Sequence, residues 1–443
     1  MTNNYTLPAE WYPTDGIMLS WPHENTDWAY MLNQIEQCYI DLVRAILPYA
    51  PILIIGPNVE GIKTSLRKAQ IKQTSNPIVL FQVPTNDTWI RDYGIITTFD
   101  ENGTPVYNDF CFNGWGLKFA ADKDNLVNSA LFNAAILNSG PYYSRQRFVL
   151  EGGSIDSDGA GTILTTSKCL YSPNRNGYKD CETAEFMLRE FLGAKRVLWL
   201  EHGFLCGDDT DSHVDTLARF ASPETILYVK CDDQDDLHYT ELSAMEEELR
   251  QMCRADGKPY NLVGLPMPYP IYDPDTDDRL PATYANFLII GDRAVIVPTY
   301  GQPDKDAEAL KLIGREFPGH EIVGVNATAL IARQLKSGER KLVQKCRLAG
   351  RGIDDMQFQR VSANIECHIT AYEVPGVITH QSVTGKVMGG NVAYGDGFYE
   401  LAGVAVVFVK ETLRVCRVLG TAHHVYEVTE SSKAAAVFTF FGE

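Results

Sequence analysis

The stretch MLNQIEQCYIDLVRAILPYAPILIIG, residues 31–56, indicates the fold class within one passage. Its first part carries apolar side chains at helical spacing, among them Ile35, Tyr39 and Ile46, so it predicts an amphipathic helix. The run 51–56 that follows is short, apolar and closed by a glycine, as is typical of a buried strand. A helix that leads directly into a buried strand favours an α/β protein.

The same alternation of strand and helix signals continues along the chain. We expect further strands at 78–83, 94–98, 103–107, 148–150, 162–165, 196–200, 225–230, 287–290, 294–297 and 321–325. We expect helices at 122–137, 182–192, within 237–255 and at 304–317. Turn signals at 100–103, 156–161 and 291–293 join neighbouring strands, and no glycine-rich phosphate loop stands at a crossover. The pattern predicts an α/β protein with short mixed sheets.

Composition narrows the class of partner. The chain has 443 residues, of which 45% are hydrophobic, so a sizeable core can be buried. The formal net charge of -18 argues against nucleic acid or an anionic membrane as a partner. The ten cysteines include no C-x-x-C pair, which speaks against a zinc or redox site and favours reduced thiols in a cytoplasmic protein. We expect no signal peptide, because the first residues lack a basic region and an apolar core, and no apolar run is long enough to predict a membrane span.

Polar and aromatic residues cluster at 86–94, directly after an expected strand. Asp92 lies close in sequence to Trp89. A carboxylate accepts paired N–H bonds from a planar cation, and an aromatic face adds cation–π attraction. The alternative is an ordinary surface turn in which Arg91 and Asp92 form an ion pair.

A second polar segment, 150–154, also ends an expected strand. Glu151 is followed by two glycines, which allow close approach of the backbone to a ligand or to another part of the chain. The alternative is a tight turn with a capping glutamate.

The third segment, 207–220, is rich in acidic residues. His213 and Asp215 are two positions apart, so they share a face in an extended chain. Histidine moves protons near neutral pH, and the aspartate can hold a cationic group beside it. The alternatives are a solvated acidic loop or a calcium site, although the EF-hand spacing with its closing glutamate is missing.

In their order along the chain, these segments resemble the agmatine deiminase family and its bacterial peptidylarginine deiminase relatives. The family-like motifs are PAEW (8–11), SWPH (20–23), WIRDYG (89–94), FNGWGLK (112–118), EGG (151–153), DSHVD (211–215), PTY (298–300) and VNATALI (325–331). Each motif is weak alone, but the ordered set spans about three quarters of the chain.

The resemblance implies a pentein-type α/β propeller of five pseudo-repeated ββαβ units, working without cofactor or metal. A cysteine thiolate would attack a guanidinium carbon, ammonia would leave, and water would hydrolyse the thiouronium. By resemblance, the clamping acids are Asp92 and Asp215, the proton carrier is His213, and the residue that orients it is Glu151. Trp89 and Trp115 would wall the pocket, with core packing as the alternative for Trp115, and Asp209 is a further candidate contact for the substrate.

The chain departs from the family pattern after Ile331. The family's G-[GS]-[LI]-H-C nucleophile motif is missing from the residues that follow. We therefore expect a deiminase-like domain at 1–331, with its last unit altered or disrupted, and an atypical tail at 332–443. Either the tail is an insertion in which Cys367, or less favourably Cys346, replaces the nucleophile, or it is foreign through fusion or a disrupted reading frame. Re-reading the coding DNA around Ile331 would separate these explanations.

Several functions follow from these alternatives. One is hydrolysis of agmatine to N-carbamoylputrescine and ammonia, a step towards putrescine. Others are a catalytically inactive guanidinium-binding homologue, a peptidylarginine deiminase and, more remotely, a calcium-binding protein using Asp208, Asp209 and Asp211. The expected partner is a small cationic guanidine, agmatine or an arginine side chain, and a homodimer stays open.

Overall fold

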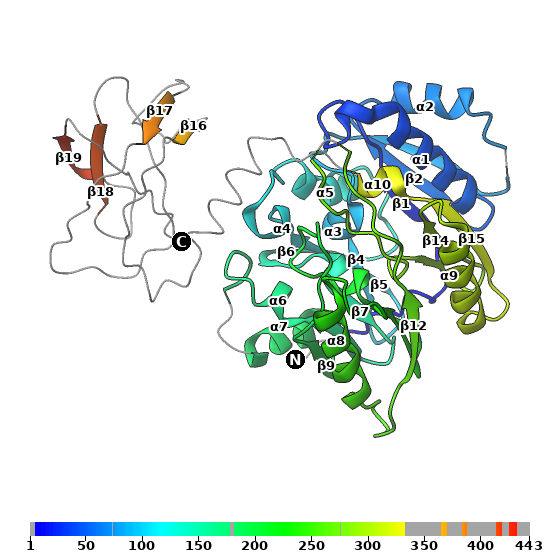
Figure 1. The fold of residues 1–443 in the computed structure, drawn as a ribbon. Coiled ribbons are helices and arrows are strands. Elements are labelled where there is room, and N and C mark those ends of the chain that lie inside the picture. The colour runs from blue at the N-terminus through cyan, green and yellow to red at the C-terminus, as the bar shows by residue number, and fades with distance from the viewer. Residues whose placement is uncertain are drawn as a thin grey trace. The chain divides into compact units, whose positions relative to one another are not determined.

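The computed structural model describes residues 5–72, 74–177, 181–274 and 276–332, and beyond these the backbone of short strands only (Figure 1). The chain divides into two compact units, Met1–Lys336 and Ser337–Glu443. The expected domain boundary, at 331/332, lies a few residues before this division. No helix among the described residues combines the length and apolar character that crossing a membrane requires.

Five three-stranded sheets follow one another along the described part of the first unit. They are β1 (Ile17–Ser20), β2 (Ile52–Gly56) and β3 (Ile78–Gln82); β4 (Ile96–Phe99), β5 (Pro105–Cys111) and β6 (Tyr142–Val149); β7 (Ile155–Ser157), β8 (Thr162–Thr166) and β9 (Arg196–Leu200); β10 (Ala218–Ser222), β11 (Thr225–Lys230) and β12 (Asn261–Pro266); and β13 (Leu288–Ile290), β14 (Ala294–Thr299) and β15 (Glu321–Asn326). Every sheet is built from strands consecutive in sequence, so each is a local unit of the chain.

The last four of these sheets share one connection pattern. The first two strands pair antiparallel and the third pairs parallel with the second. A parallel neighbour needs a long crossover, and helices lie on these crossovers. They are α5 (Val127–Asn133), α7 (Cys181–Leu192), α8 (Tyr239–Gln251) and α9 (Pro303–Glu316). The expected α/β class with ββαβ units is therefore confirmed, while closure of the units around one axis stays a prediction.

The first sheet is the exception, because β1, β2 and β3 are all parallel. Two helices make its crossovers, α1 (Leu32–Ile46) and α2 (Val59–Lys68). The apolar face predicted for α1 is buried at Ile35, Tyr39 and Ile46, as helical spacing requires. The α2 helix, which the sequence reading missed, begins where the Asn58 side chain accepts a hydrogen bond from the Gly61 amide at 2.9 Å.

The predicted turns join the strands as expected. Between β4 and β5, the Asp100 carboxylate accepts hydrogen bonds from the amides of Asn102 and Thr104, at 2.9 and 2.8 Å. Asp158 closes the turn between β7 and β8 in the same manner. Such side-chain bonds to the local backbone are the reason that aspartate favours turns.

Two predicted elements differ from the structure. The helix expected at 122–137 is divided into the short 3-10 helix η2 (Asp124–Leu126) and α5. The strand expected at 148–150 begins earlier, because β6 extends back to Tyr142 through mostly exposed polar residues. A strand at the edge of a sheet can carry such residues, so its polar half gave no periodic signal.

The fifth sheet keeps all three strands and is followed by α10 (Thr328–Ile331). The expected alteration of the last unit therefore does not affect its sheet. In the second unit, β16 (Ile365–Ile369) pairs antiparallel with β17 (Val383–Val387), and β18 (Leu413–Val418) with β19 (Val425–Ser431). Cys367 belongs to β16, but its side chain lies outside the described residues, as does Cys346 altogether.

Candidate active site

The three polar segments singled out in the sequence are connections from one sheet to the next. They contain α3 (Ile90–Tyr93) after β3, and the 3-10 helices η3 (Gly152–Ser154) after β6 and η4 (Val214–Thr216) after β9. The helix α3 contacts η3, and η3 contacts η4. Residues about 60 positions apart in the chain are thereby brought into one buried cluster.

Gly153 marks the centre of this cluster. A β-carbon added there would lie 2.6 Å from Nδ1 of His213, 2.7 Å from Oδ2 of Asp215 and 2.8 Å from Oδ1 of Asp92. All three side chains are buried. Two carboxylates and one imidazole edge therefore converge beside Gly153, where there is no room for a side chain. We call the place where these three groups converge the Gly153 point.

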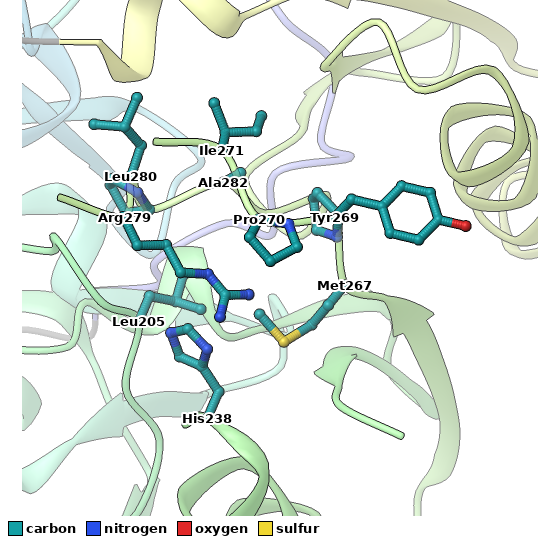
Figure 2. Close-up of a pocket in the computed structure, with 11 residues that line it drawn as sticks. Leu205, His238, Met267, Tyr269, Pro270, Ile271, Arg279, Leu280 and Ala282 are labelled. Atoms are coloured by element: carbon teal, nitrogen blue, oxygen red, sulfur yellow. The ribbon is translucent and has the colours of Figure 1, made fainter. Parts of the chain in front are cut away.

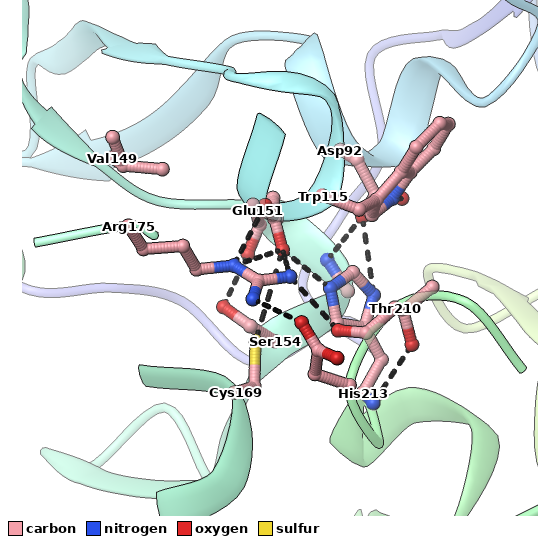
Figure 3. A network of polar contacts seen from close by, with 12 residues as sticks. Asp92, Trp115, Val149, Glu151, Ser154, Cys169, Arg175, Thr210 and His213 are labelled. Atoms are coloured by element: carbon pink, nitrogen blue, oxygen red, sulfur yellow. Dashed lines mark hydrogen bonds and ion pairs between the residues drawn. The ribbon is translucent and has the colours of Figure 1, made fainter. Parts of the chain in front are cut away.

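His213 is held at both ring nitrogens. Its Nε2 lies 2.7 Å from Oε2 of Glu151, and its Nδ1 lies 3.5 Å from Oδ1 of Asp92 (Figure 3). Burial lowers the pKa of His213, but Asp92, Cys169 and Glu151 outweigh it and raise this pKa well above its ordinary value. The raised pKa favours the charged form of the ring, whose Nδ1 lies on the side of the Gly153 point.

Asp92 is fixed by two hydrogen bonds from the protein. The Gly153 amide donates to Oδ1 at 3.0 Å, and the Trp115 indole Nε1–H donates to Oδ2 at 2.9 Å. Burial raises the pKa of Asp92, although His213 and these two donors lower it in part. The carboxylate is thus set in place before any ligand arrives.

Asp215 differs, because its Oδ1 is buried and has no hydrogen-bond partner among the described residues. Burial raises the pKa of this carboxyl to about 6, against the opposing influence of His213. A buried acceptor without a partner is costly, and a donor at the Gly153 point would relieve that cost.

Trp115 reaches Asp92 from an unusual turn. Gly114, Trp115, Gly116 and Leu117 all have positive φ, between 55° and 80°. Left-handed backbone is unfavourable for residues with a β-carbon, so the two glycines reduce the cost and the contacts of Trp115 maintain the rest. Its ring packs edge-on against Phe112, with centroids 4.9 Å apart. Of the two alternatives that the sequence offered for Trp115, core packing holds, and the indole also donates to Asp92. Its role as a wall of the substrate pocket stays a prediction.

The sequence reading missed Arg175 and Cys169. Figure 3 shows Glu151 between Arg175 and His213, with Cys169 below the carboxylate. Arg175 forms an ion pair with Glu151 at 2.9 Å, and both side chains are almost fully buried. These contacts and His213 outweigh burial and lower the pKa of Glu151. The run Pro173–Asn176 carried no periodicity, so only an arginine among turn-forming residues hinted at a role.

Glu151, Cys169 and His213 are also of the types that bind metal, and their ligand atoms lie within 4.8 Å of one another. However, Glu151 and His213 already share a short hydrogen bond, and Arg175 donates to the same carboxylate. The Cys169 thiol contacts Glu151 at 3.7 Å, and burial raises its pKa. This trio fits an internal hydrogen-bond network better than a metal site.

The calcium alternative fits the acidic loop poorly. Asp211 forms ion pairs with Lys118 and Arg175, both at 2.7 Å. Asp208 accepts hydrogen bonds from the amides of Thr210 and Ser212. These carboxylates are neutralised or saturated by the protein itself, and two nearby cations oppose a divalent ion.

Two further predicted site residues, Trp89 and Asp209, lie in the segments that carry Asp92 and His213. Trp89 is half-buried at the start of α3, and its ring centroid lies 5.8 Å from that of Trp28. The Asp209 backbone carbonyl accepts a hydrogen bond from Lys118, in the loop that leads to His213. The roles of Trp89 and Asp209 towards a substrate stay predictions.

A separate pocket adjoins the connection after β12 (Figure 2). Met267, Pro270 and Leu280 give it an apolar wall. Its polar members are occupied, because His238 Nδ1 lies 2.7 Å from Asp236 and Nε2 accepts the Cys206 amide at 2.8 Å. The pocket therefore presents mainly apolar surface, and the buried carboxylates of the Gly153 cluster remain the chemically equipped site.

Known proteins resemble this chain over about three quarters of its length. The family described as Porphyromonas-type peptidyl-arginine deiminase matches residues 6–335. The agmatine deiminase of Pseudomonas aeruginosa strain LESB58 is 30% identical over 344 residues, covering 73% of this chain and 90% of that protein. A solved C. jejuni agmatine deiminase, with a cysteine replaced by serine and substrate bound, is 38% identical, with a TM-score of 0.67 over 74% of this chain and 92% of its own. The corresponding Enterococcus faecalis enzyme is 28% identical, with a TM-score of 0.67 over 74% of this chain and 92% of its own.

Proposed function

Because the chain belongs to the Porphyromonas-type peptidyl-arginine deiminase family, we propose that its site binds the guanidinium group of a small cation, agmatine. The observation that carries this proposal is the meeting of Asp92, His213 and Asp215 at the Gly153 point. A guanidinium ion is planar and donates in several directions, so it suits two separate carboxylates better than one. Asp215 offers an oxygen that no described group uses.

The reaction we propose is hydrolysis of agmatine to N-carbamoylputrescine and ammonia. A cysteine thiolate forms a bond to the guanidinium carbon, and a C–N bond breaks as His213 gives its proton to the departing nitrogen. His213 then takes a proton from water, whose oxygen attacks the sulfur-bound carbon. The C–S bond breaks, which releases the product and regenerates the thiolate.

Individual roles follow from the same proposal. Asp92 and Asp215 would clamp the guanidinium, and Glu151 would keep His213 oriented through its 2.7 Å hydrogen bond. Trp89 would contribute a wall, and Asp209 would attract the amine of agmatine. Cys367 is the proposed nucleophile. Its preference over Cys346 rests on the sequence alone.

A second candidate is a guanidinium-binding protein without deiminase activity. It is favoured by the loss of the family's G-x-x-H-C motif in the residues after Ile331. A third candidate is a deiminase that acts on arginine side chains of peptides. It would bind the guanidinium group in the same way, but the rest of its substrate would be a peptide. Relatives named agmatine deiminase favour the free amine.

The test uses the purified full-length chain. Agmatine binding is measured by calorimetry, and release of ammonia and N-carbamoylputrescine is followed with agmatine and with a blocked arginine peptide. Cys367→Ala is the test variant and Cys346→Ala its matched control. Turnover of agmatine that is lost only in Cys367→Ala supports the full proposal. Binding without turnover favours the inactive binder, and turnover of the peptide alone favours the third candidate. A protein that neither binds agmatine nor turns over agmatine or the peptide contradicts all three candidates.

A further inference from the structure

Arg175 is a buried cation of the described cluster that donates hydrogen bonds to Glu151, Asp211 and Thr210. Nothing in the proposed reaction uses it. Its side chain is 1% exposed, although it carries a full charge. A buried guanidinium persists only when its N–H groups are satisfied, so its partners indicate which parts of the fold it holds.

One edge of Arg175 binds Glu151. Its Nε donates to both carboxylate oxygens, at 3.0 and 3.1 Å, and its Nη2 donates to Oε2 at 2.9 Å. The same Oε2 accepts the hydrogen bond from His213 Nε2. Because two donors of Arg175 converge on this carboxylate, Glu151 cannot rotate away from the imidazole without breaking them.

The other edge of Arg175 binds the loop that carries His213. Its Nη1 donates to the Asp211 carboxylate at 2.7 Å, and its Nη2 donates to the Thr210 carbonyl at 2.9 Å. Asp211 and Ser212 both have positive φ, 64° and 66°, directly before His213. Two consecutive non-glycine residues in this region are strained, and such backbone persists only when its surroundings fix it.

From these contacts we propose that Arg175 is a positioning residue, which sets the imidazole of His213 by clamping Glu151 and the 210–212 backbone together. In this arrangement the proton on Nε2 of His213 stays in the hydrogen bond to Glu151. Only Nδ1 is then left to exchange protons at the Gly153 point. Only the planar fork of arginine spans both partners, since lysine offers one compact charge. This inference rests on the proposed function for its use in the reaction, but its geometry can be tested without substrate.

The test is ¹⁵N histidine NMR on the full-length protein without ligand. His213→Asn identifies the His213 signals, and the short Nε2–H···Glu151 bond predicts a downfield Nε2 proton that exchanges slowly with water. In Arg175→Met we expect this proton to shift upfield and exchange freely, and in Arg175→Lys to lie between the two. Arg189→Met, which removes an exposed arginine on α7, is the matched control and should leave the signal unchanged.

Chemical rescue keeps the inference testable even if Arg175→Met is unstable. Arg175→Ala leaves a cavity, and added guanidinium chloride should restore the downfield proton, whereas urea, of similar shape without the charge, should not. Agmatine affinity should fall at least about tenfold in Arg175→Met and recover in part in Arg175→Lys.

The outcomes separate this inference from the proposed function. A folded Arg175→Met protein that keeps the wild-type Nε2 proton overturns the positioning role, whether or not agmatine binds. A wild-type protein that shows the signature but binds no agmatine overturns the proposed function and leaves the positioning role standing.

Discussion

Replacing Asp215 by asparagine should stabilise the protein while abolishing the guanidinium binding that we propose. The carboxyl is buried, and its Oδ1 has no partner among the described residues. Its pKa rises from 3.8 to about 6 on folding. At about 1.36 kcal/mol for each factor of ten, an ionised Asp215 at pH 7.5 costs the fold about 3 kcal/mol. Asparagine has nearly the same shape and never carries this charge.

The sign of the pH dependence follows from linkage. A carboxyl whose folded pKa is raised binds protons more readily in the folded state, so wild-type stability falls as pH rises from about 4 to about 6. Asp215→Asn lacks this loss. We therefore expect it to be more stable than wild type by up to about 3 kcal/mol at pH 7.5, with a much smaller difference at pH 4.

Urea unfolding followed by fluorescence measures the stability difference at pH 7.5 and at pH 4. Urea is used as the denaturant because guanidinium chloride would itself be a candidate ligand. Asp292→Asn, at an exposed turn between β13 and β14, is the matched control and should change stability little. Agmatine affinity, measured by calorimetry, should fall at least a hundredfold in Asp215→Asn, as for loss of a charged hydrogen-bond partner. An asparagine variant that is less stable than wild type at pH 7.5, or that still binds agmatine normally, refutes the reasoning.

Three further predictions concern the same cluster. Gly153→Ala adds a carbon at the point that the carboxylates face, so calorimetry should detect no agmatine binding, whereas Gly16→Ala, whose nearest neighbour would be 3.4 Å away, should bind as wild type does. Trp115→Phe removes the 2.9 Å donor to Asp92 and should weaken agmatine binding about tenfold with the fold retained, and unchanged affinity would show that this bond does not prepare the site. Because burial raises the pKa of Asp92, and that of Asp215 to about 6, agmatine binding should strengthen between pH 5 and pH 7.5, and a flat profile would contradict a grip by two carboxylates.

Sequence patterns predicted the parts of the fold that repeat locally. The face of α1 and the turn at Asp100 follow from side-chain spacing and local hydrogen bonding, and the structure confirms both. The resemblance to the deiminase family, drawn from an ordered set of motifs, is also confirmed. The sequence did not predict the polar half of β6 or the break between η2 and α5, because neither has a periodic pattern.

The candidate site was predictable only in part for a related reason. Asp92, Glu151 and His213 stand within recognisable motifs in the connections between sheets, and the structure gathers them. Arg175 stands in a stretch of turn residues, and its importance arises from two partners, Glu151 and Asp211, that lie 24 and 36 positions away. A residue whose role depends on distant partners leaves no local signature in one sequence.

The origin of the cluster in connections between sheets has a consequence for how the protein could be divided. Asp92 follows the first sheet, Glu151 the second and His213 the third. No single sheet with its helix carries all three of these residues. Each residue lies in the connection between two neighbouring sheets. A polypeptide that stopped before residue 213 would contain three complete sheets with Asp92 and Glu151, but it would lack the imidazole of His213. Agmatine binding would therefore report that at least three consecutive units have assembled, and would serve as a readout of cooperative folding in truncation series.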